Sequence, residues 1–410
     1  MQTHLSPEFA DSPEAQAAAA ILRKCVHCGF CNATCPTYQL LGDELDGPRG
    51  RIYLIKQVLE GAAVTRSTQQ HLDRCLTCLN CQTTCPSGVE YGHLVDIGRQ
   101  LVEARVERPL LEKAKRWLLK DGLTSPLFAP AMRLGKTLRA VLPNAVKHKV
   151  PARSAARARL RPARAQPRKV LMLQGCVQPS MMPNIDIAAA RVLDCAGIQI
   201  VYGEGAGCCG ALRTHLSDHG GALHDMRRNI DAWIPLLDSG AVEAIVSSAS
   251  ACGLAIKEYA HALADDPNYR DKALRVSAMA RDLSELLPEL VPALKTRVRA
   301  SHGQRLAFHS PCTLQHGHKL LGGVEKHLRA LGFEVAAPSQ ESHMCCGSAG
   351  TYSILQPELA KQLRDRKLGN LAMLEPQCIL SANIGCIQHL QSGTSTPVMH
   401  WIEHLDQALA

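Results

Sequence analysis

The cysteine pattern near the N-terminus constrains this chain more than any other sequence feature. The run Cys-x2-Cys-x2-Cys-x3-Cys-Pro occurs twice, and the second copy begins 50 residues after the first. Its cysteines are Cys25, Cys28, Cys31 and Cys35, then Cys75, Cys78, Cys81 and Cys85. Thiolates at this spacing hold three corners of an iron–sulfur cube, and the fourth cysteine of each run ligates the other cube. The spacing therefore predicts two neighbouring [4Fe-4S] clusters and an electron-transfer function.

Crossed ligation divides the eight cysteines into two sets. The first cluster is expected on Cys25, Cys28, Cys31 and Cys85. The second is expected on Cys75, Cys78, Cys81 and Cys35. Structural zinc is the main alternative, but zinc sites usually come as separated Cys-x2-Cys pairs. Disulfides are the other alternative, and they are typical of secreted proteins.

Composition favours a cytoplasmic location. The first residues, MQTHLSPEFADSPEAQ, lack the basic run and apolar core of a signal peptide, and no stretch of 18 apolar residues is present. We therefore expect the 18 cysteines to act as thiols or ligands and not as disulfides. A chain of 410 residues is long enough for two or three domains with cores of their own.

The positive charge of the chain is concentrated in one segment. Between Gly122 and Ile185 there is no Asp or Glu, and there are twelve basic residues. Without these twelve, the 46 Lys and Arg fall to 34, fewer than the 37 Asp and Glu. The segment has prolines and no apolar periodicity after residue 150, so it is interpreted as a basic linker. No set of aromatic stacking residues and no recognised module accompany it, so we expect no nucleic-acid partner.

The part of this segment over 127–143 offers a further hypothesis, which is peripheral contact with an anionic membrane. Met132, Leu134, Leu138 and Val141 can form one apolar flank, with basic residues beside it. Such contact would bring the chain to the inner membrane surface, where a quinone could accept electrons.

After the linker, strands, helices and cysteines repeat on a long period. The first copy has a strand at 169–176, helix 184–196, strand 198–204, helix 219–239 and strand 242–250. The second copy has a strand at 305–312, helix 318–331, strand 333–338, helix 357–374 and strand 378–383. Alternating strands and helices predict parallel sheets, in which the loops after the strands gather at one edge.

Four cysteines of each copy fall in loops at predicted strand ends, so we expect them to converge. They are Cys176, Cys208, Cys209 and Cys252, then Cys312, Cys345, Cys346 and Cys386. Each doublet is followed by glycine, which allows a tight turn close to a metal or sulfur. The string Gly205, Gly207 and Gly210 also matches a dinucleotide fingerprint, but the second copy lacks its first two glycines.

Together these patterns predict a mixed α/β chain with four parts. A helical two-cluster ferredoxin-type domain is expected at 1–110 and a helical and basic linker at 111–168. Two related α/β cysteine-rich domains with parallel sheets are expected at 169–300 and 301–410.

This organisation resembles the cysteine-rich subunits that accompany flavin dehydrogenases and heterodisulfide reductases. The segments GPRGRIYLIK (47–56), HSPCTLQHG (309–317), MCCGSAGTY (344–352) and SANIGC (381–386) are most similar to the glycolate oxidase iron–sulfur subunit family. The resemblance implies that a partner subunit holds FAD and oxidises glycolate to glyoxylate. It also implies that this chain passes the electrons toward a quinone-like acceptor and carries no catalytic residue for the oxidation itself.

One departure limits the comparison with heterodisulfide reductases. In that group each cysteine-rich repeat ends in Cys-x2-Cys and five thiolates hold an unusual cluster, whereas here Ala249 and Asn383 replace the first cysteine of that pair. Four ligands per repeat suit zinc, a modified cluster or no metal, and the sequence leaves these open. Cys195 and Cys378 have no counterparts in the repeat and are interpreted as core residues.

Several charged and imidazole side chains near the cysteines are candidates for supporting roles. His309, His316, His318 and His343 surround the cysteines of the second repeat and could ligate metal or relay protons. Arg49 and Arg51 lie between the two cluster runs, where positive charge raises a reduction potential, although they could equally pair with nearby acids.

Three classes of function follow from these patterns. The leading class is an electron-transfer subunit of a glycolate dehydrogenase, with lactate or glycerol 3-phosphate as alternative substrates of the partner. The second is a self-sufficient reductase acting at the cysteine-rich repeats, which the missing fifth cysteines disfavour. The third is a zinc-stabilised interaction module.

Overall fold

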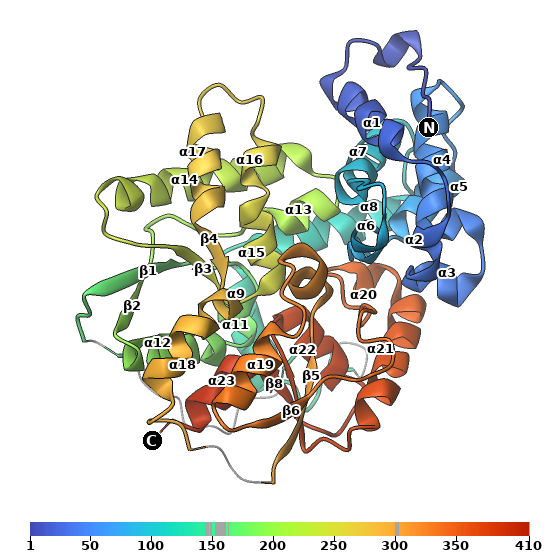
Figure 1. Cartoon of the computed structure of the whole chain (residues 1–410). Helices are drawn as coiled ribbons and strands as arrows, with labels where there is room; N and C mark the ends of the chain where they lie inside the picture. Colours follow the sequence, from blue (N-terminus) through green and yellow to red (C-terminus); the bar gives the residue numbers. More distant parts are fainter. Residues whose placement is uncertain (144–146, 148–149, 152–160, 163, 300–302, 410) are drawn as a thin grey trace.

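The structure is a computed structural model that describes residues 1–143, 147, 150–151, 161–162, 164–299 and 303–409 (Figure 1). Its N-terminal part is helical, and its C-terminal part consists of two α/β repeats. This arrangement confirms the predicted fold class. None of the helices in these ranges combines the length and hydrophobicity that crossing a bilayer requires.

The N-terminal part, called here the cluster domain, is built from short helices joined by the cysteine loops. They are η1 (Pro7–Phe9), α1 (Pro13–Lys24), α2 (Phe30–Ala33), α3 (Pro36–Leu41), η2 (Glu44–Asp46), α4 (Pro48–Leu59), α5 (Arg66–Asp73), α6 (Asn80–Thr84) and α7 (Tyr91–Glu103). Ser12 caps α1 by accepting a hydrogen bond from the Ala15 N–H, and Pro13 takes the first helical position. The helices α1, α4 and α7 enclose an aliphatic core that includes Leu22, Ile55 and Leu94.

Each cysteine-rich repeat contains a four-stranded parallel sheet. In the first repeat β1 (Arg168–Met172), β2 (Ile198–Val201), β3 (Ile245–Ser247) and β4 (Ala280–Asp282) take the order β2-β1-β3-β4. In the second, β5 (Arg305–His309), β6 (Glu334–Ala336), β7 (Cys378–Ser381) and β8 (Val398–His400) take the order β6-β5-β7-β8. The two sheets therefore have the same topology, and in each the strand order reverses beside the first strand.

Helices connect the strands and cover the sheets. Those of the first repeat are α11 (Gln178–Met181), α12 (Asn184–Cys195), α13 (Ala211–His215), α14 (His219–Asp238), α15 (Ser250–Lys257), α16 (Tyr259–Ala262), α17 (Arg270–Met279), η4 (Leu283–Leu286) and α18 (Leu287–Leu294). Those of the second are η5 (Thr313–Gly317), α19 (Gly323–Ala330), α20 (Tyr352–Leu355), α21 (Pro357–Ala372), α22 (Ile384–Gln391) and α23 (Trp401–Gln407). The segment before the first repeat holds α8 (Leu110–Trp117), η3 (Leu118–Gly122) and α9 (Phe128–Thr137).

The two repeats share one hydrophobic core and join at the ends of β3 and β7. The Ser250 N–H donates to the Ala382 carbonyl at 3.1 Å, and a ring nitrogen of His400 lies 2.9 Å from the Ser248 carbonyl oxygen. Residues of β1 and α12 pack in the same core as residues of β5 and α23. This joint brings the loops that follow the strands of both sheets close to one another.

The structure differs from the sequence predictions in a few local features. The fourth strands β4 and β8 were not predicted, and the helix expected at 318–331 starts only at Gly323. Cys195 is the last residue of α12 and packs against the shared core, and Cys378 is buried within that core, so both have the core positions that were predicted.

Candidate iron–sulfur and cysteine sites

The four cysteines predicted for the first cluster line one cavity of the cluster domain. Cys25, Cys28, Cys31 and Cys85 all border it, together with Cys81 of the second set. Cys28 is exposed, and the cavity wall beside it carries Val26 and Phe30, whose exposed fractions are 69% and 62%. Burial, and then the nearby Cys25 thiol, raises the pKa of Cys31 to about 11. Metal binding at this set would therefore release protons from the thiols.

The second predicted set lines a neighbouring and more deeply placed cavity. Cys35, Cys75, Cys78 and Cys81 border it, and all four are buried. Burial, and then the neighbouring Cys78 thiol, raises the pKa of Cys81 well above its ordinary value. Each cavity thus combines three thiols of one run with the fourth thiol of the other. This donor set fits a [4Fe-4S] cluster in each cavity with crossed ligation.

The two cysteine loops have the same backbone shape. His27 and Thr77, two residues after the first cysteine of each run, have φ of 59° and 51°, and Gly29 and Leu79 have φ of 85° and 62°. Left-handed conformation at Thr77 and Leu79 costs free energy that glycine avoids, and such strain persists where the surroundings impose it. In the second loop the Thr77 N–H donates to the Cys75 sulfur at 3.4 Å.

Buried positive charge lies beside the second set. Arg51, with a side chain 1% exposed, donates to the Cys35 sulfur at 4.0 Å and to the His71 carbonyl at 2.7 Å. Its charge is balanced by Asp46 at 3.5 Å, which also pairs with Arg74 at 2.7 Å. Arg49, in contrast, pairs with Glu44 at the surface. The expected pairing with nearby acids is therefore confirmed for both arginines, and Arg51 also contacts a predicted cluster ligand.

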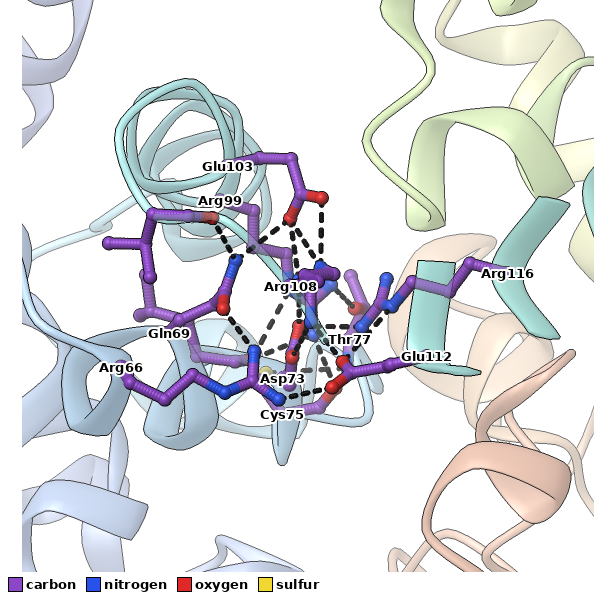
Figure 2. Close-up of polar contacts among 12 residues, drawn as sticks. Arg66, Gln69, Asp73, Cys75, Thr77, Arg99, Glu103, Arg108, Glu112 and Arg116 are labelled. Atoms are coloured by element: carbon purple, nitrogen blue, oxygen red, sulfur yellow. Dashed lines mark hydrogen bonds and ion pairs between the residues drawn. The ribbon is translucent and has the colours of Figure 1, made fainter. Parts of the chain in front are cut away.

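A charged network fixes the loop that carries Cys75 to α7 and to the residues that follow α7 (Figure 2). Arg99 donates to the Leu72 and Cys75 carbonyls at 2.9 and 2.6 Å and to the Thr77 hydroxyl at 3.0 Å. Beneath it, Arg108 is 3% exposed and pairs with three carboxylates. They are Asp73, Glu103 and Glu112. No sequence pattern predicts this network, since its members are spread over 66–116 without regular spacing.

In the first repeat the four predicted cysteines come together as a chain of contacts. The Cys176 thiol lies beside that of Cys208, Cys208 beside Cys209, and Cys209 beside Cys252. Gly210, with φ of 88°, donates its N–H to the Cys208 sulfur at 3.5 Å, which confirms the predicted glycine turn. The doublet is held from behind by Asn229, which donates to the Cys208 carbonyl at 2.7 Å.

A dinucleotide site would need a ribose-binding acid about 20 residues after the glycine string, and the two acids nearest that position have other partners. Asp225 pairs with Arg213 and Arg228, and Asp231 accepts a hydrogen bond from Tyr269. These contacts agree with the interpretation of the string as part of the cysteine turn.

The cysteines of the second repeat form the same chain and lie against the cluster domain. The Cys312 and Cys345 sulfurs are 3.9 Å apart, and the Cys346 thiol lies beside those of Cys345 and Cys386. Gly347 repeats the turn with φ of 88° and an N–H 3.4 Å from the Cys345 sulfur. Cys78 of the second cluster set packs in one apolar group with Cys345, and Cys312 borders this group.

Of the four predicted histidines, the structure brings only His309 to the cysteines. His309 is buried at the end of β5, and a ring nitrogen lies within 4.8 Å of the Cys346 and Cys386 sulfurs. His316 bonds the His343 carbonyl at 3.0 Å, and His318 bonds the Ser250 carbonyl at 2.9 Å, so these side chains have structural roles. His343 itself is half-buried on the same loop.

A large cavity of about 880 Å³ joins these sites. Its wall includes Cys75 of the cluster domain and one or more cysteines from both repeats. The wall is mainly apolar, with side chains such as Phe128 and Met132 from α9 and Ile354 from α20. A cavity of this size and character can hold a small organic molecule.

An exposed apolar band follows α8 to α9 on the outside of the molecule. Leu110, Leu111, Trp117, Leu118 and Leu127 are between 62% and 82% exposed, and Leu134, Leu138 and Val141 continue the band. Basic side chains lie among them. The predicted flank over 127–143 is therefore only part of a longer band, and Met132 lies in the cavity wall and not on the flank. The Lys136 ammonium group donates to the Ser180 and Met181 carbonyls, so it is not available to contact anionic lipid beside the flank.

Comparison with known proteins agrees with this geometry. Residues 21–89 match the 4Fe-4S dicluster domain, and 170–257 and 306–391 each match the cysteine-rich domain. The chain is 53% identical over its full length to the glycolate oxidase iron-sulfur subunit of Escherichia coli (strain K12), covering 99% of that protein. It is 28% identical to the probable glycolate oxidase iron-sulfur subunit of Bacillus subtilis (strain 168), over 91% of this chain and 89% of that one. Lactate utilization protein A of Bacillus licheniformis is 25% identical over 58% of this chain and 99% of its own length.

Proposed function

The chain belongs to the glycolate oxidase iron–sulfur subunit family, and on that basis we propose that it is the electron-transfer subunit of a glycolate dehydrogenase. The observation that carries the proposal is the pair of cysteine-lined cavities side by side in the cluster domain. Each set of four thiolates would hold a [4Fe-4S] cluster, which carries one electron. Oxidation of an alcohol releases an electron pair, so a flavin on a partner subunit must divide it.

The exposed side of the first cluster set is the proposed entry point for electrons. Cys28 lies at the surface between Val26 and Phe30, and Tyr53 nearby is 45% exposed. An exposed apolar surface around a cluster ligand suits docking of the FAD subunit, because contact there excludes water and shortens the path to the cluster.

The second cluster set and the large cavity are the proposed exit. Cys75 belongs to both, and the cavity's mainly apolar wall suits the flat ring and isoprenoid tail of a quinone. This proposal can be tested by filling the cavity with Ala251→Phe on α15, which borders it. Quinone reduction should fall at least tenfold while reduction of a water-soluble dye by the complex is kept. The exposed Ala264→Phe serves as the control. Equal loss of both activities would show that the cavity is not the acceptor site.

The exposed band from α8 to α9 supports peripheral contact with the cytoplasmic face of the inner membrane. Its leucines and Trp117 can enter the headgroup region while neighbouring basic residues meet anionic lipid. Sedimentation with anionic vesicles should retain the chain at low salt and release much of it at high salt. Trp117→Glu with Leu118→Glu should abolish retention, whereas Met373→Glu, another exposed apolar position outside the band, should not. An unchanged distribution for the double variant would contradict membrane contact through this band.

The division of labour between subunits is tested with purified components. The isolated chain with both clusters should show no glycolate-dependent dye reduction until the FAD subunit is added. Lactate and glycerol 3-phosphate tested in parallel identify the hydroxy acid that the partner accepts. Turnover of glycolate by the lone chain would contradict the proposal.

A further inference from the structure

The two repeats differ in the residue that lies three positions before their first cysteine. His309 stands three residues before Cys312, and the corresponding residue of the first repeat, three before Cys176, is Leu173. Both side chains are buried at the ends of equivalent strands. In the described chain, the Nε2 atom of His309 is a buried polar atom without a hydrogen-bond partner. An unpartnered buried polar atom costs free energy, so its retention calls for an explanation.

The surroundings of His309 have the composition of a metal site. A ring nitrogen of His309 and the sulfurs of Cys346 and Cys386 all lie within 4.8 Å of one another, and all three residues are buried. Two thiolates and one imidazole are donors that Zn²⁺ prefers, at about 2.3 Å for sulfur and about 2.0 Å for nitrogen. Two sulfurs and one nitrogen at those lengths around one tetrahedral ion lie about 3.5 to 3.8 Å apart, so small side-chain movements would close the site.

Neighbouring groups hold these donors in place. The Ser381 hydroxyl donates to the His309 carbonyl at 2.9 Å, and Asn383 donates its side-chain N–H to the Cys386 sulfur at 3.7 Å. Such contacts orient ligands and are typical of metal sites. In the first repeat Ala249 stands in place of Asn383, so both the third donor and this contact are missing there.

We propose that the second repeat binds one mononuclear Zn²⁺ through His309, Cys346 and Cys386, and that the first repeat lacks this site. The proposal goes beyond electron transfer by the two clusters, because zinc carries no electrons and would fix the end of β5 to α22. That joint lies at the cavity wall and close to the cysteines that pack against the cluster domain.

Metal analysis of the full chain tests the proposal. Protein prepared anaerobically without chelators from zinc-containing medium should hold about one zinc beside about eight iron. His309→Leu, which copies the residue that the first repeat tolerates, should reduce zinc at least fivefold and leave iron and acid-labile sulfide unchanged. Cys209→Ser in the first repeat and His343→Gln should keep the zinc.

X-ray absorption at the zinc edge of the unaltered chain gives a readout that does not depend on the variants folding. It should show two sulfurs at about 2.3 Å and one imidazole nitrogen at about 2.0 Å. Absence of zinc, zinc that persists in His309→Leu, or iron that rises above about eight and falls in that variant would each overturn the proposal.

Discussion

Arg51 and Cys35 are in contact inside the cluster domain: the guanidinium Nη1 lies 4.0 Å from the cysteine sulfur, and neither side chain is open to solvent. A positive charge at this position stabilises the reduced form of a cluster bound to Cys35. The contact also crosses the two cysteine runs, since Cys35 belongs to the first run but lines the cavity of the second.

We predict that Arg51→Met lowers the reduction potential of the cluster on Cys75, Cys78, Cys81 and Cys35 by tens of millivolts. About 59 mV corresponds to a tenfold change for one electron. Arg51→Lys keeps the charge and should shift the potential less. Potentiometric titration followed by electron paramagnetic resonance measures both, and equal shifts for the two variants would assign the effect to packing instead of charge.

Crossed ligation predicts a swapped pattern of spectral changes. Cys28→Ser should alter the paramagnetic signal of one cluster, while Cys35→Ser, only seven positions later in the same run, should alter that of the other. The comparison Cys75→Ser should match Cys35→Ser. If Cys28→Ser and Cys35→Ser changed the same signal, each run would hold its own cluster.

The buried network of Figure 2 predicts a large stability effect at Arg108. Arg108→Met would remove the cation that Asp73, Glu103 and Glu112 share near the loop of Cys75, leaving Arg116 on Asp73 and Arg66 on Glu112. Breaking a buried ion pair in this way costs up to about 3 to 5 kcal/mol. Arg275→Met, which breaks an exposed pair with Asp238, should cost less than about 1 kcal/mol. Urea unfolding of the cluster-loaded chain measures the free energies, and similar losses for both variants would contradict a structural role for the network.

Stability of the joined repeats should fall in acid because of His400. Burial lowers the pKa of His400 to about 3, so the folded chain keeps this imidazole neutral while the unfolded chain binds a proton below about pH 6.5. The unfolded state then binds more protons, so the contribution of His400 to stability falls by about 1.4 kcal/mol per pH unit between about 6.5 and 3.

His400→Gln provides the comparison for this pH dependence. The variant should be less stable at pH 8, because the ring accepts the Ile402 N–H at the start of α23 and bonds the Ser248 carbonyl. Its stability should nevertheless decline less steeply between pH 6.5 and 5 than that of the original chain. If the free energy of unfolding fell equally steeply with pH in the variant and in the original chain, His400 would not be the source of the acid sensitivity.

Local sequence patterns predicted the cysteine loops and most of the strands, because these features depend on the spacing of residues that are close in the chain. The cysteine runs determine ligand loops within a few residues, and the alternation of apolar runs and helices predicted six of the eight strands. The strands β4 and β8 were missed because each has three residues, too few for any periodicity to appear.

Features that depend on contacts between distant segments could not be predicted. Four histidines near the second repeat's cysteines were equal candidates in sequence, and only the end of β5 brings His309 to Cys346 and Cys386. The contact of Cys78 with the second repeat, likewise, depends on how two surfaces meet. The apolar band from α8 was missed because its exposure, and not its composition, makes it unusual.

The central claim is that electrons pass from a partner's flavin into the clusters of this chain. The most direct measurement is electron paramagnetic resonance of the anaerobic complex after glycolate is added without an acceptor. Signals of reduced [4Fe-4S] clusters should appear in the complex, disappear when a quinone is added, and never appear in the isolated chain with glycolate. Glyoxylate formation by a complex whose clusters stay oxidised in the absence of acceptor, or reduction of the isolated chain by glycolate, would contradict it.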